Sequence, residues 1–424
     1  MRNYGSIEGM PGRVFVVLSG ADGSGKTTAV RLLASLLSLR GPVCTHWLRG
    51  SHLLASLLAR FLSRFSVFRG GCNPYYGICI PGRLRGVWVR VEFWSFIPHL
   101  FVRFLLRRLC GFLVCDRGSF DFLVWLVSTL GSPSLLRGVY GGFLLRLARA
   151  REVAHLLNVN KPLTSLVGLF GLKKVVISYQ FSYLPAVHSN WKVKEALIER
   201  GSKIVIGTSR RITNLFSNGV FIYPPVDIEL FKPREKEYTR HILRLPSNKI
   251  IIGYVGDIDV NRGFDVVAKL AAELGGDDIK FLITYLRIDN ITRDVMVSIK
   301  RALKKNSLIV KRTIPVWYVY NAVDVLLLPI RNSYPTEPPA TLLEALASGT
   351  PVIGGPSPSL KDYESLYIKV KDDDYLDVVK QIIDIRKELN ELSIRAREFA
   401  VKNLSYQAVL QRLSKIVNMM YPFN

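Results

Sequence analysis

The first third of this 424-residue chain has almost no lysine and few acidic residues. Lys26 is the only lysine before Lys161, and residues 1–150 hold 18 arginines against five acidic residues. Residues 151–424 hold 39 basic and 28 acidic residues, and the whole chain carries a formal charge of +25. A basic excess favours anionic partners such as nucleotides, nucleic acid or acidic lipid headgroups. The change in lysine usage indicates two segments of separate ancestry.

Cysteines are also few, and all five lie in the first 115 residues. The count is odd and no C-x-x-C pair occurs, so we expect neither a disulfide framework nor a zinc site. The polar, Gly-rich stretch Met1–Pro11 does not have the pattern of a signal peptide. We therefore expect a cytoplasmic protein, with peripheral attachment at the inner membrane surface as an extension of that expectation.

Apolar runs of transmembrane length are missing, although hydrophobic residues make up 49% of the chain. A spanning helix needs about 20 mostly apolar residues. The stretch Phe93–Cys115 is interrupted by Arg103, Arg107 and Arg108, and the uncharged stretch Phe122–Leu136 is too short. Both fit either buried or half-buried helices, which we favour, or helices that lie on a membrane surface.

Alternating strand and helix patterns run through the chain and predict an α/β fold with parallel, doubly wound sheets. The first strand is expected at Val14–Ser19, followed by a helix at Lys26–Leu39, and the tail from Leu376 to Met420 favours two or three helices. We expect three parts: a P-loop domain at 1–160, a reduced acceptor-side segment at 161–235, and a Rossmann-like nucleotide-sugar domain with tail helices at 236–424.

A phosphate-binding loop is the most specific motif, because Gly20–Thr27 fits the pattern G-x-x-x-x-G-K-[ST] between a strand and a helix. Backbone amides of such a loop surround a phosphate, Lys26 reaches the β- and γ-oxygens, and the Thr27 hydroxyl binds Mg²⁺. We therefore predict binding of ATP and Mg²⁺. The residues assigned to this site are Gly20, Asp22, Gly23, Ser24, Gly25, Lys26, Thr27 and Thr28.

Asp116 ends the apolar run Phe112–Cys115 and precedes Arg117. A carboxylate at a strand end beside a P-loop can hold Mg²⁺ through water, so Asp116 is a candidate metal-binding residue and both residues are candidate catalytic residues. The P-loop and this Asp-Arg pair resemble the thymidylate-kinase-like P-loop kinases over about residues 12–130. The resemblance implies phosphoryl transfer from ATP, but the Arg-rich lid of that family has no counterpart after Ala154–Val159, so turnover should be feeble.

A second nucleotide site is predicted in the C-terminal half. Gly253 and Gly256 follow an apolar strand, Arg262-Gly263 opens a helix, and Glu344 lies in a later helix. Backbone amides at such strand and helix ends can bind a pyrophosphate, and a carboxylate can bind ribose hydroxyls. A solvated surface position is the alternative explanation for Glu344.

The motifs Tyr223–Asp227, Phe231–Pro233, Gly253–Gly263 and Glu344–Val352 together resemble family 4 retaining glycosyltransferases of the GT-B fold, over about residues 173–424. The resemblance implies that a nucleotide-diphosphate-sugar is the donor, that Glu344 binds its ribose, and that Arg262 replaces a lysine on its phosphates.

Two positions depart from this glycosyltransferase pattern. Asp257 stands where the family has an arginine, and its carboxylate can pair with Arg262 and weaken donor binding. The family's first glutamate falls on Thr336, so Glu337 is one residue late as a donor-binding residue. The backbone amides near Glu337 are nevertheless expected to complete the phosphate site.

Three functions fit these motifs. The first is a glycosyltransferase fused to an ATP-binding, kinase-like domain, with a membrane-surface or lipid-linked acceptor. The second is a nucleotide kinase acting on a dTMP-like acceptor, with a non-catalytic C-terminal part. The third is a non-catalytic nucleotide-binding fusion. No nucleic-acid-binding module is recognisable, so nucleic acid is not an expected partner.

Overall fold

The computed structural model describes most of the chain. The described residues are 14–20, 26–39, 41–47, 54–70, 77–116, 153–157, 177–187, 191–288, 291–312, 314–331, 336–370, 374–381 and 386–420, with single positions 122, 126, 130, 139, 140, 142 and 189. They divide into two compact units. The first unit comprises Met1–Gln180, Asn190–Ile206 and Phe216–Val220, and the second comprises Phe181–Ser189, Gly207–Leu215 and Phe221–Asn424.

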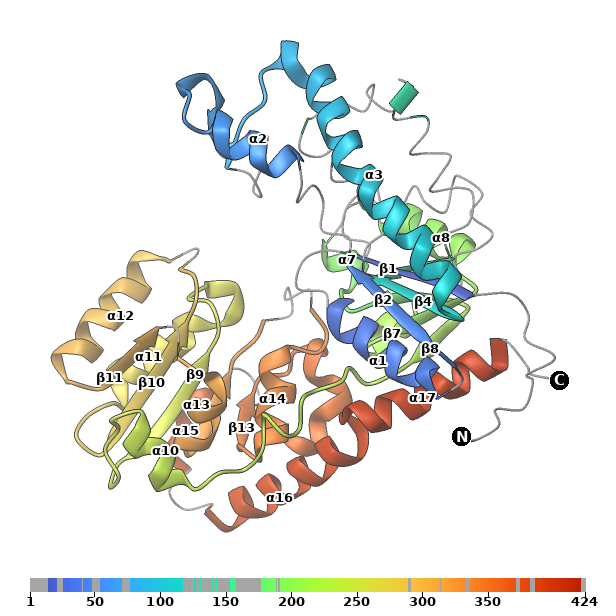
Figure 1. Ribbon diagram of the computed structural model, residues 1–424. Coiled ribbons are helices and arrows are strands. Elements are labelled where there is room, and N and C mark those ends of the chain that lie inside the picture. The colour runs from blue at the N-terminus through green and yellow to red at the C-terminus, as the bar shows by residue number, and fades with distance from the viewer. Residues whose placement is uncertain are drawn as a thin grey trace. The chain divides into compact units, whose positions relative to one another are not determined.

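The first unit is built on a seven-stranded sheet with the order β2-β4-β1-β5-β6-β7-β8 (Figure 1). The pairs β2·β4, β4·β1, β1·β5 and β5·β6 are parallel. Apolar, β-branched runs form these strands, as expected for a sheet with helices on its faces. The strands are β1 (Val14–Gly20), β2 (Val43–Trp47), β4 (Phe112–Asp116), β5 (Val153–Leu157), β6 (Ile177–Gln180), β7 (Ile204–Gly207) and β8 (Gly219–Phe221).

Helices of the first unit follow the strands in the order that the sequence predicts. Helix α1 begins at Lys26, six residues after the end of β1. Helix α2 packs against the long α3, where the Ala55 amide donates to Ser95 Oγ at 2.8 Å. The elements are α1 (Lys26–Ser38), α2 (Leu54–Leu62), η1 (Ser66–Phe68), η2 (Gly82–Leu84), α3 (Arg85–Leu109) and α8 (Trp191–Gly201).

The second unit is built on a six-stranded sheet with the order β11-β10-β9-β12-β13-β14, and every recorded pair in it is parallel. The central strands are buried on both faces, which explains their continuous apolar runs. The strands are β9 (Ile250–Val255), β10 (Ile279–Tyr285), β11 (Leu308–Arg312), β12 (Val325–Leu328), β13 (Val352–Gly354) and β14 (Ile368–Lys369).

Helices pack on this sheet through two clusters of buried apolar side chains. One cluster is centred on α11, and the other on α14 and α16. Three described helices follow β14, as the tail pattern predicts. The helical elements are α7 (Leu184–Val187), α9 (Arg210–Thr213), α10 (Lys236–Ile242), η4 (Val260–Arg262), α11 (Phe264–Glu273), α12 (Arg293–Lys304), α13 (Val316–Ala322), α14 (Ala340–Ser348), η5 (Pro358–Leu366), α15 (Tyr375–Gln381), α16 (Arg386–Asn403) and α17 (Tyr406–Met420).

Two findings differ from a simple sequence interpretation. The strands β6, β7 and β8 extend the sheet that begins with β1, so one sheet runs across the boundary expected near residue 160. The sequence did not indicate a disulfide framework, yet Cys44 in β2 and Cys110 ahead of β4 are bonded, with Cα atoms 5.8 Å apart. The register of β2 on β4 places Cys44 opposite Leu113, so the path of the chain just before β4, which residue spacing does not reveal, brings Cys110 to Cys44.

No helix in the described part of the chain has both the length and the apolar content to cross a membrane. This agrees with the interrupted apolar runs in the sequence.

Candidate nucleotide-sugar site

The second sheet has one topological switch point, between β9 and β12. From β9 the chain proceeds outward to β10 and β11, then returns to the other side of β9 for β12 and β13. In open parallel sheets, ligands bind at the carboxyl ends of the strands where the order reverses. The segments at this place are Gly256–Gly263 after β9, Pro329–Arg331 after β12, and the start of α14.

The loop after β9 holds an ion-pair cluster. Asp257 Oδ2 lies 3.3 Å from Arg262 Nη2 and 3.8 Å from Arg287 Nη2. The predicted pairing of Asp257 with Arg262 is therefore confirmed. The Tyr254 hydroxyl donates to the Asp257 carbonyl at 2.7 Å and fixes the backbone of the loop. The Asp257 carboxylate thus forms ion pairs with two arginines beside the switch point.

Gly263 permits a very close approach between this loop and the end of β12. Its φ of 76° is in the left-handed region, and a Cβ there would lie 1.9 Å from the Pro329 carbonyl oxygen. Only glycine fits such a position. Farther along, the Arg331 guanidinium pairs with Asp265 in the first turn of α11. These two residues were not singled out in the sequence, although they border the same edge.

Glu344 lies in the middle of α14 and is half-buried. The Tyr320 hydroxyl of α13 donates to Glu344 Oε2 at 2.7 Å. Burial raises the pKa of Glu344, and the hydrogen bond from Tyr320 opposes that rise. The Thr341 hydroxyl, one turn earlier in α14, donates to the Val255 carbonyl at 3.5 Å, so the helix start is tied to the end of β9. A solvated surface position is therefore wrong for Glu344.

Glu337 is completely buried three residues before α14. Its Oε2 accepts from Ser209 Oγ at 2.8 Å and its Oε1 accepts from Arg211 Nη1 at 3.0 Å. The Glu337 amide donates to the Phe181 carbonyl at 2.9 Å. Burial raises the pKa of Glu337, while Ser209 and Arg211 act in the opposite direction. Glu337 thus joins three separate chain segments of the second unit.

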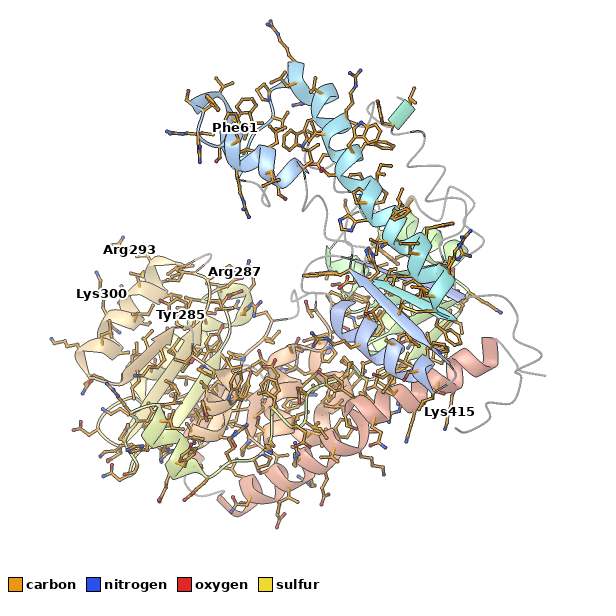
Figure 2. All side chains as sticks on the ribbon, in the orientation of Figure 1. Phe61, Tyr285, Arg287, Arg293, Lys300 and Lys415 are labelled. Atoms are coloured by element: carbon orange, nitrogen blue, oxygen red, sulfur yellow. A yellow bond between two sulfur atoms is a disulfide. The ribbon has the colours of Figure 1, made fainter. Side chains whose placement is uncertain are left out.

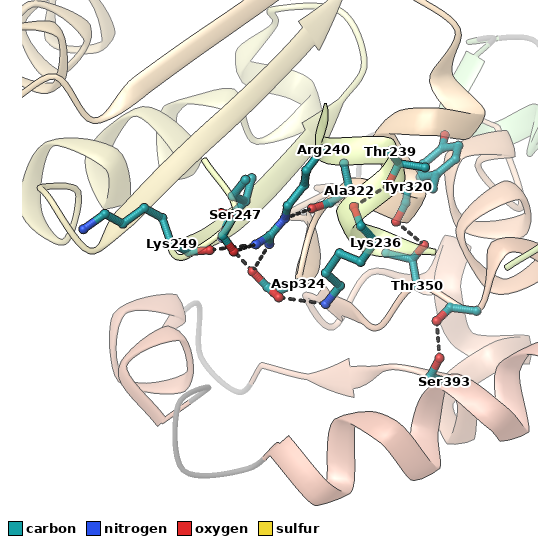
Figure 3. Close-up of polar contacts among 12 residues, drawn as sticks. Lys236, Thr239, Arg240, Ser247, Lys249, Tyr320, Ala322, Asp324, Thr350 and Ser393 are labelled. Atoms are coloured by element: carbon teal, nitrogen blue, oxygen red, sulfur yellow. Dashed lines mark hydrogen bonds and ion pairs between the residues drawn. The ribbon is translucent and has the colours of Figure 1, made fainter. Parts of the chain in front are cut away.

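The amino ends of the strands carry a different carboxylate. Asp324, just before β12, pairs with Arg240 at 2.7 Å and Lys236 at 2.8 Å, and accepts the Ile251 amide at 2.7 Å (Figure 3). Burial alone would raise the pKa of Asp324, but the bonds from Lys236 and the Ile251 amide lower it overall. Because this cluster lies at the edge opposite the strand carboxyl ends, it joins β9, β12 and α10 rather than forming a ligand site.

The predicted phosphate loop of the first unit falls largely outside the described residues. These omit Asp22, Gly23, Ser24, Gly25 and Arg117 completely, and they omit the side chains of Lys26, Thr27 and Thr28 at the start of α1. Gly20 ends β1, and buried Asp116 ends the adjacent β4, opposite Leu18. Among described residues, no three His, Cys, Asp or Glu side chains cluster as metal ligands. The Mg²⁺ assignment to Thr27 and Asp116 stays a prediction.

Comparison with protein families gives a match over residues 235–399, to the family described as "Glycosyl transferases group 1". The matched region contains the β9 to β13 part of the sheet, with Gly256, Arg262, Glu337 and Glu344. It does not extend into the first unit, so the resemblance to thymidylate-kinase-like proteins stays a prediction. No curated protein matches the sequence.

Solved structures extend the likeness to nearly the whole chain. Anabaena HepE in complex with UDP is 13% identical with a TM-score of 0.59, covering 89% of this chain and 100% of that one. HepE in complex with UDP and glucose is 11% identical with a TM-score of 0.60, and the match covers 95% of this chain and 99% of that one. Sucrose-phosphate synthase from Thermosynechococcus elongatus is 15% identical with a TM-score of 0.60, and the match covers 97% of this chain and 100% of that one. At these identities the likeness shows the fold alone, which is the α/β GT-B fold with parallel sheets.

Proposed function

We propose that this protein is a retaining glycosyltransferase that transfers a sugar from a nucleotide-diphosphate-sugar to an acceptor hydroxyl. The observation that carries the proposal is Glu344, a half-buried carboxylate oriented by Tyr320 in a helix that starts at the carboxyl end of β9. The family match over residues 235–399 supports it. The two HepE structures are complexes with UDP, so UDP-sugars are the first donors to test.

Each donor group has a candidate partner at the switch point. Glu344 accepts hydrogen bonds from the ribose hydroxyls, and the Arg262 guanidinium donates to the pyrophosphate. The first turn of α14 adds backbone partial charge near the same phosphates. The Gly256 amide, predicted to take part, donates instead to the Thr284 carbonyl at 3.0 Å. Glu337 does not touch the donor; it positions the start of α14 through its bonds to Ser209 and Arg211.

Transfer breaks the bond between the sugar C1 and the β-phosphate oxygen. The nucleoside diphosphate leaves with the bonding electrons, the acceptor oxygen bonds to C1 on the same face, and the acceptor proton passes to the leaving β-phosphate oxygen. Negative charge grows on the leaving phosphate, so Arg262 stabilises the transition state more than the ground state. Asp257 opposes this, since it competes for the same guanidinium.

Calorimetry on the full chain with UDP- and GDP-sugars tests the donor site. We expect weak binding that Asp257→Arg strengthens by about ten- to a hundredfold, because one charge-assisted hydrogen bond contributes roughly 1.5–3 kcal/mol. Glu344→Ala should abolish binding, whereas Glu364→Ala, at an exposed pair with Lys369, should leave it unchanged. If no donor binds even the Asp257→Arg variant, the glycosyltransferase proposal is wrong.

A second activity is supported by the sheet of the first unit. The register that pairs Leu18 with Asp116 brings the end of β4 beside the end of β1, where the motif Gly20–Thr28 begins. This is where a carboxylate could hold Mg²⁺ near a bound triphosphate. We therefore propose that Mg·ATP binds there through Lys26. The Lys26→Ala variant should lose the thermal stabilisation that ATP gives, and equal stabilisation of variant and wild type would refute the assignment.

Kinase turnover should be feeble, because phosphoryl transfer depends on positioned positive charge around the γ-phosphate and the lid motif is missing from the sequence. Robust transfer from ATP to dTMP would favour the nucleotide kinase instead. Binding of both nucleotides without any turnover would favour a non-catalytic fusion.

A further inference from the structure

Helices α2 and α3 of the first unit carry apolar side chains on their exposed faces. On α2 the positions 54, 57 and 61 are spaced three and four residues apart and so lie on one face. The opposite face, with Ala55 and Ala59, is buried against α3. The exposed side chains of this face, with the following Phe65, are Leu54 at 52%, Leu57 at 65%, Phe61 at 54% and Phe65 at 49% (Figure 2 labels Phe61).

Helix α3 repeats this arrangement over 25 residues, or about 37 Å. Its buried face contributes Trp88, Phe93 and Phe96 to an apolar cluster. Its exposed face follows a spacing of three, four or seven residues, as one side of a helix does. The large side chains there are Val87 at 54%, Trp94 at 57%, Phe101 at 61%, Leu105 at 42% and Leu109 at 76%. The prediction of a buried or half-buried helix is therefore confirmed over Phe93–Leu109, where one face of α3 is buried and the other is exposed.

The charges between these apolar side chains have one sign. Eight arginines of residues 54–116 are exposed or half-exposed around the two helices, at positions 60, 64, 69, 83, 85, 90, 107 and 108. The only acidic residues in that range are Glu92 and Asp116, and both are buried. We call the exposed apolar side chains and these arginines the α2–α3 surface. It presents positive charge and apolar side chains without an exposed carboxylate in that range.

We propose that the α2–α3 surface binds the face of a bilayer that contains anionic lipids. Arginine guanidinium groups pair with lipid phosphates, while leucine, phenylalanine and tryptophan side chains enter the boundary between headgroups and acyl chains. Aromatic side chains and arginine alone would also suit single-stranded nucleic acid. The aliphatic side chains at 54, 57, 87, 105 and 109 have no partner there, and this favours lipid.

Vesicle sedimentation with the full chain tests the proposal. Binding is expected to vesicles of mixed phosphatidylcholine and phosphatidylglycerol, to weaken at high salt, and to be much lower on pure phosphatidylcholine. The combined variant Leu57→Ser, Phe61→Ser, Trp94→Ser and Phe101→Ser should not sediment. A matched control changes the exposed apolar residues of α12, with Met296→Ser, Val297→Ser and Leu303→Ser, and should bind like wild type.

A second variant keeps the test decisive if the first one does not fold. Replacing exposed arginines, with Arg60→Gln, Arg90→Gln and Arg108→Gln, leaves every apolar side chain in place and should weaken binding about a hundredfold. Unchanged vesicle binding by this variant would overturn the proposal. So would a concentration-dependent dimer, or binding of a single-stranded oligonucleotide, with no binding to vesicles.

Discussion

Arginine has different surroundings in the two units. In the second unit Arg240 pairs with Asp324, Arg211 with Glu337, Arg262 with Asp257 and Arg331 with Asp265. On the α2–α3 surface of the first unit, arginines alternate with exposed apolar side chains, and the acidic residues between positions 54 and 116 are buried. A guanidinium paired inside the fold joins chain segments, whereas one without an acidic neighbour is available to an outside anion.

The largest expected effect comes from breaking the Asp324 pairs. Arg240 is almost completely buried, so Asp324→Ala leaves its guanidinium without a carboxylate and should lower the free energy of unfolding by about 3 kcal/mol or more. Because the pKa of Asp324 is lowered on folding, its contribution is present above the ordinary value of 3.8 and is lost as the pH falls through the lowered pKa.

Urea unfolding at neutral pH and in acid checks this prediction. The control is Glu364→Ala, which breaks a pair with Lys369 that is exposed on both sides and should cost less than about 1 kcal/mol. Equal losses in the two variants would show that burial does not distinguish these pairs.

A smaller loss is expected for Glu337→Gln. The amide keeps one acceptor oxygen for either Arg211 or Ser209 and presents its NH2 group to the other, so the cost of about 1–3 kcal/mol comes from the lost hydrogen bond and not from the lost charge. If Glu337 positions α14, donor affinity in calorimetry should also fall, while the bound stoichiometry stays the same. A variant with normal donor affinity would show that Glu337 stabilises the fold without affecting the donor site.

The pair of Asp257 with Arg262 should behave in the opposite way. It lies at the proposed donor site, so Asp257→Asn should release the guanidinium and raise donor affinity about tenfold, or about 1.4 kcal/mol. The variant Arg262→Gln should remove that gain when combined with Asp257→Asn. A gain that persists in the double variant would mean that Asp257 does not act through Arg262.

Glu344 differs from the carboxylates that pair with arginine, because its hydrogen bond comes from the Tyr320 hydroxyl. Folding raises its pKa above 4.5, so this group favours folding only when protonated, and its contribution is lost as the pH rises through the raised pKa. Glu344→Gln should therefore stabilise the fold at neutral pH and do so less near pH 4.5, while abolishing donor binding. Melting curves of the variant and the wild type at both pH values measure the gain in stability. An equal gain at the two pH values would show that the charge of the ionised Glu344 carboxylate does not destabilise the fold.

Sequence patterns predicted the local features of this molecule well. Apolar runs located most of the strands, and the five-residue spacing of Asp257 and Arg262 was enough to predict their pairing. Contacts between distant segments were not predictable in this way. Arg211 and Glu337 are 126 residues apart, and Cys44 and Cys110 are 66 residues apart. Only the three-dimensional fold brings the members of each pair together.

The polar network around Glu337 has a consequence for how the chain can be divided. A fragment that begins at residue 236 keeps the whole second sheet, but it lacks Phe181, Ser209 and Arg211. Such a fragment would contain a buried carboxylate and a backbone amide whose partners were left on the discarded piece. The second unit is therefore not encoded by one continuous stretch: to be exchanged intact, it has to carry the segments Phe181–Ser189 and Gly207–Leu215 together with Phe221–Asn424.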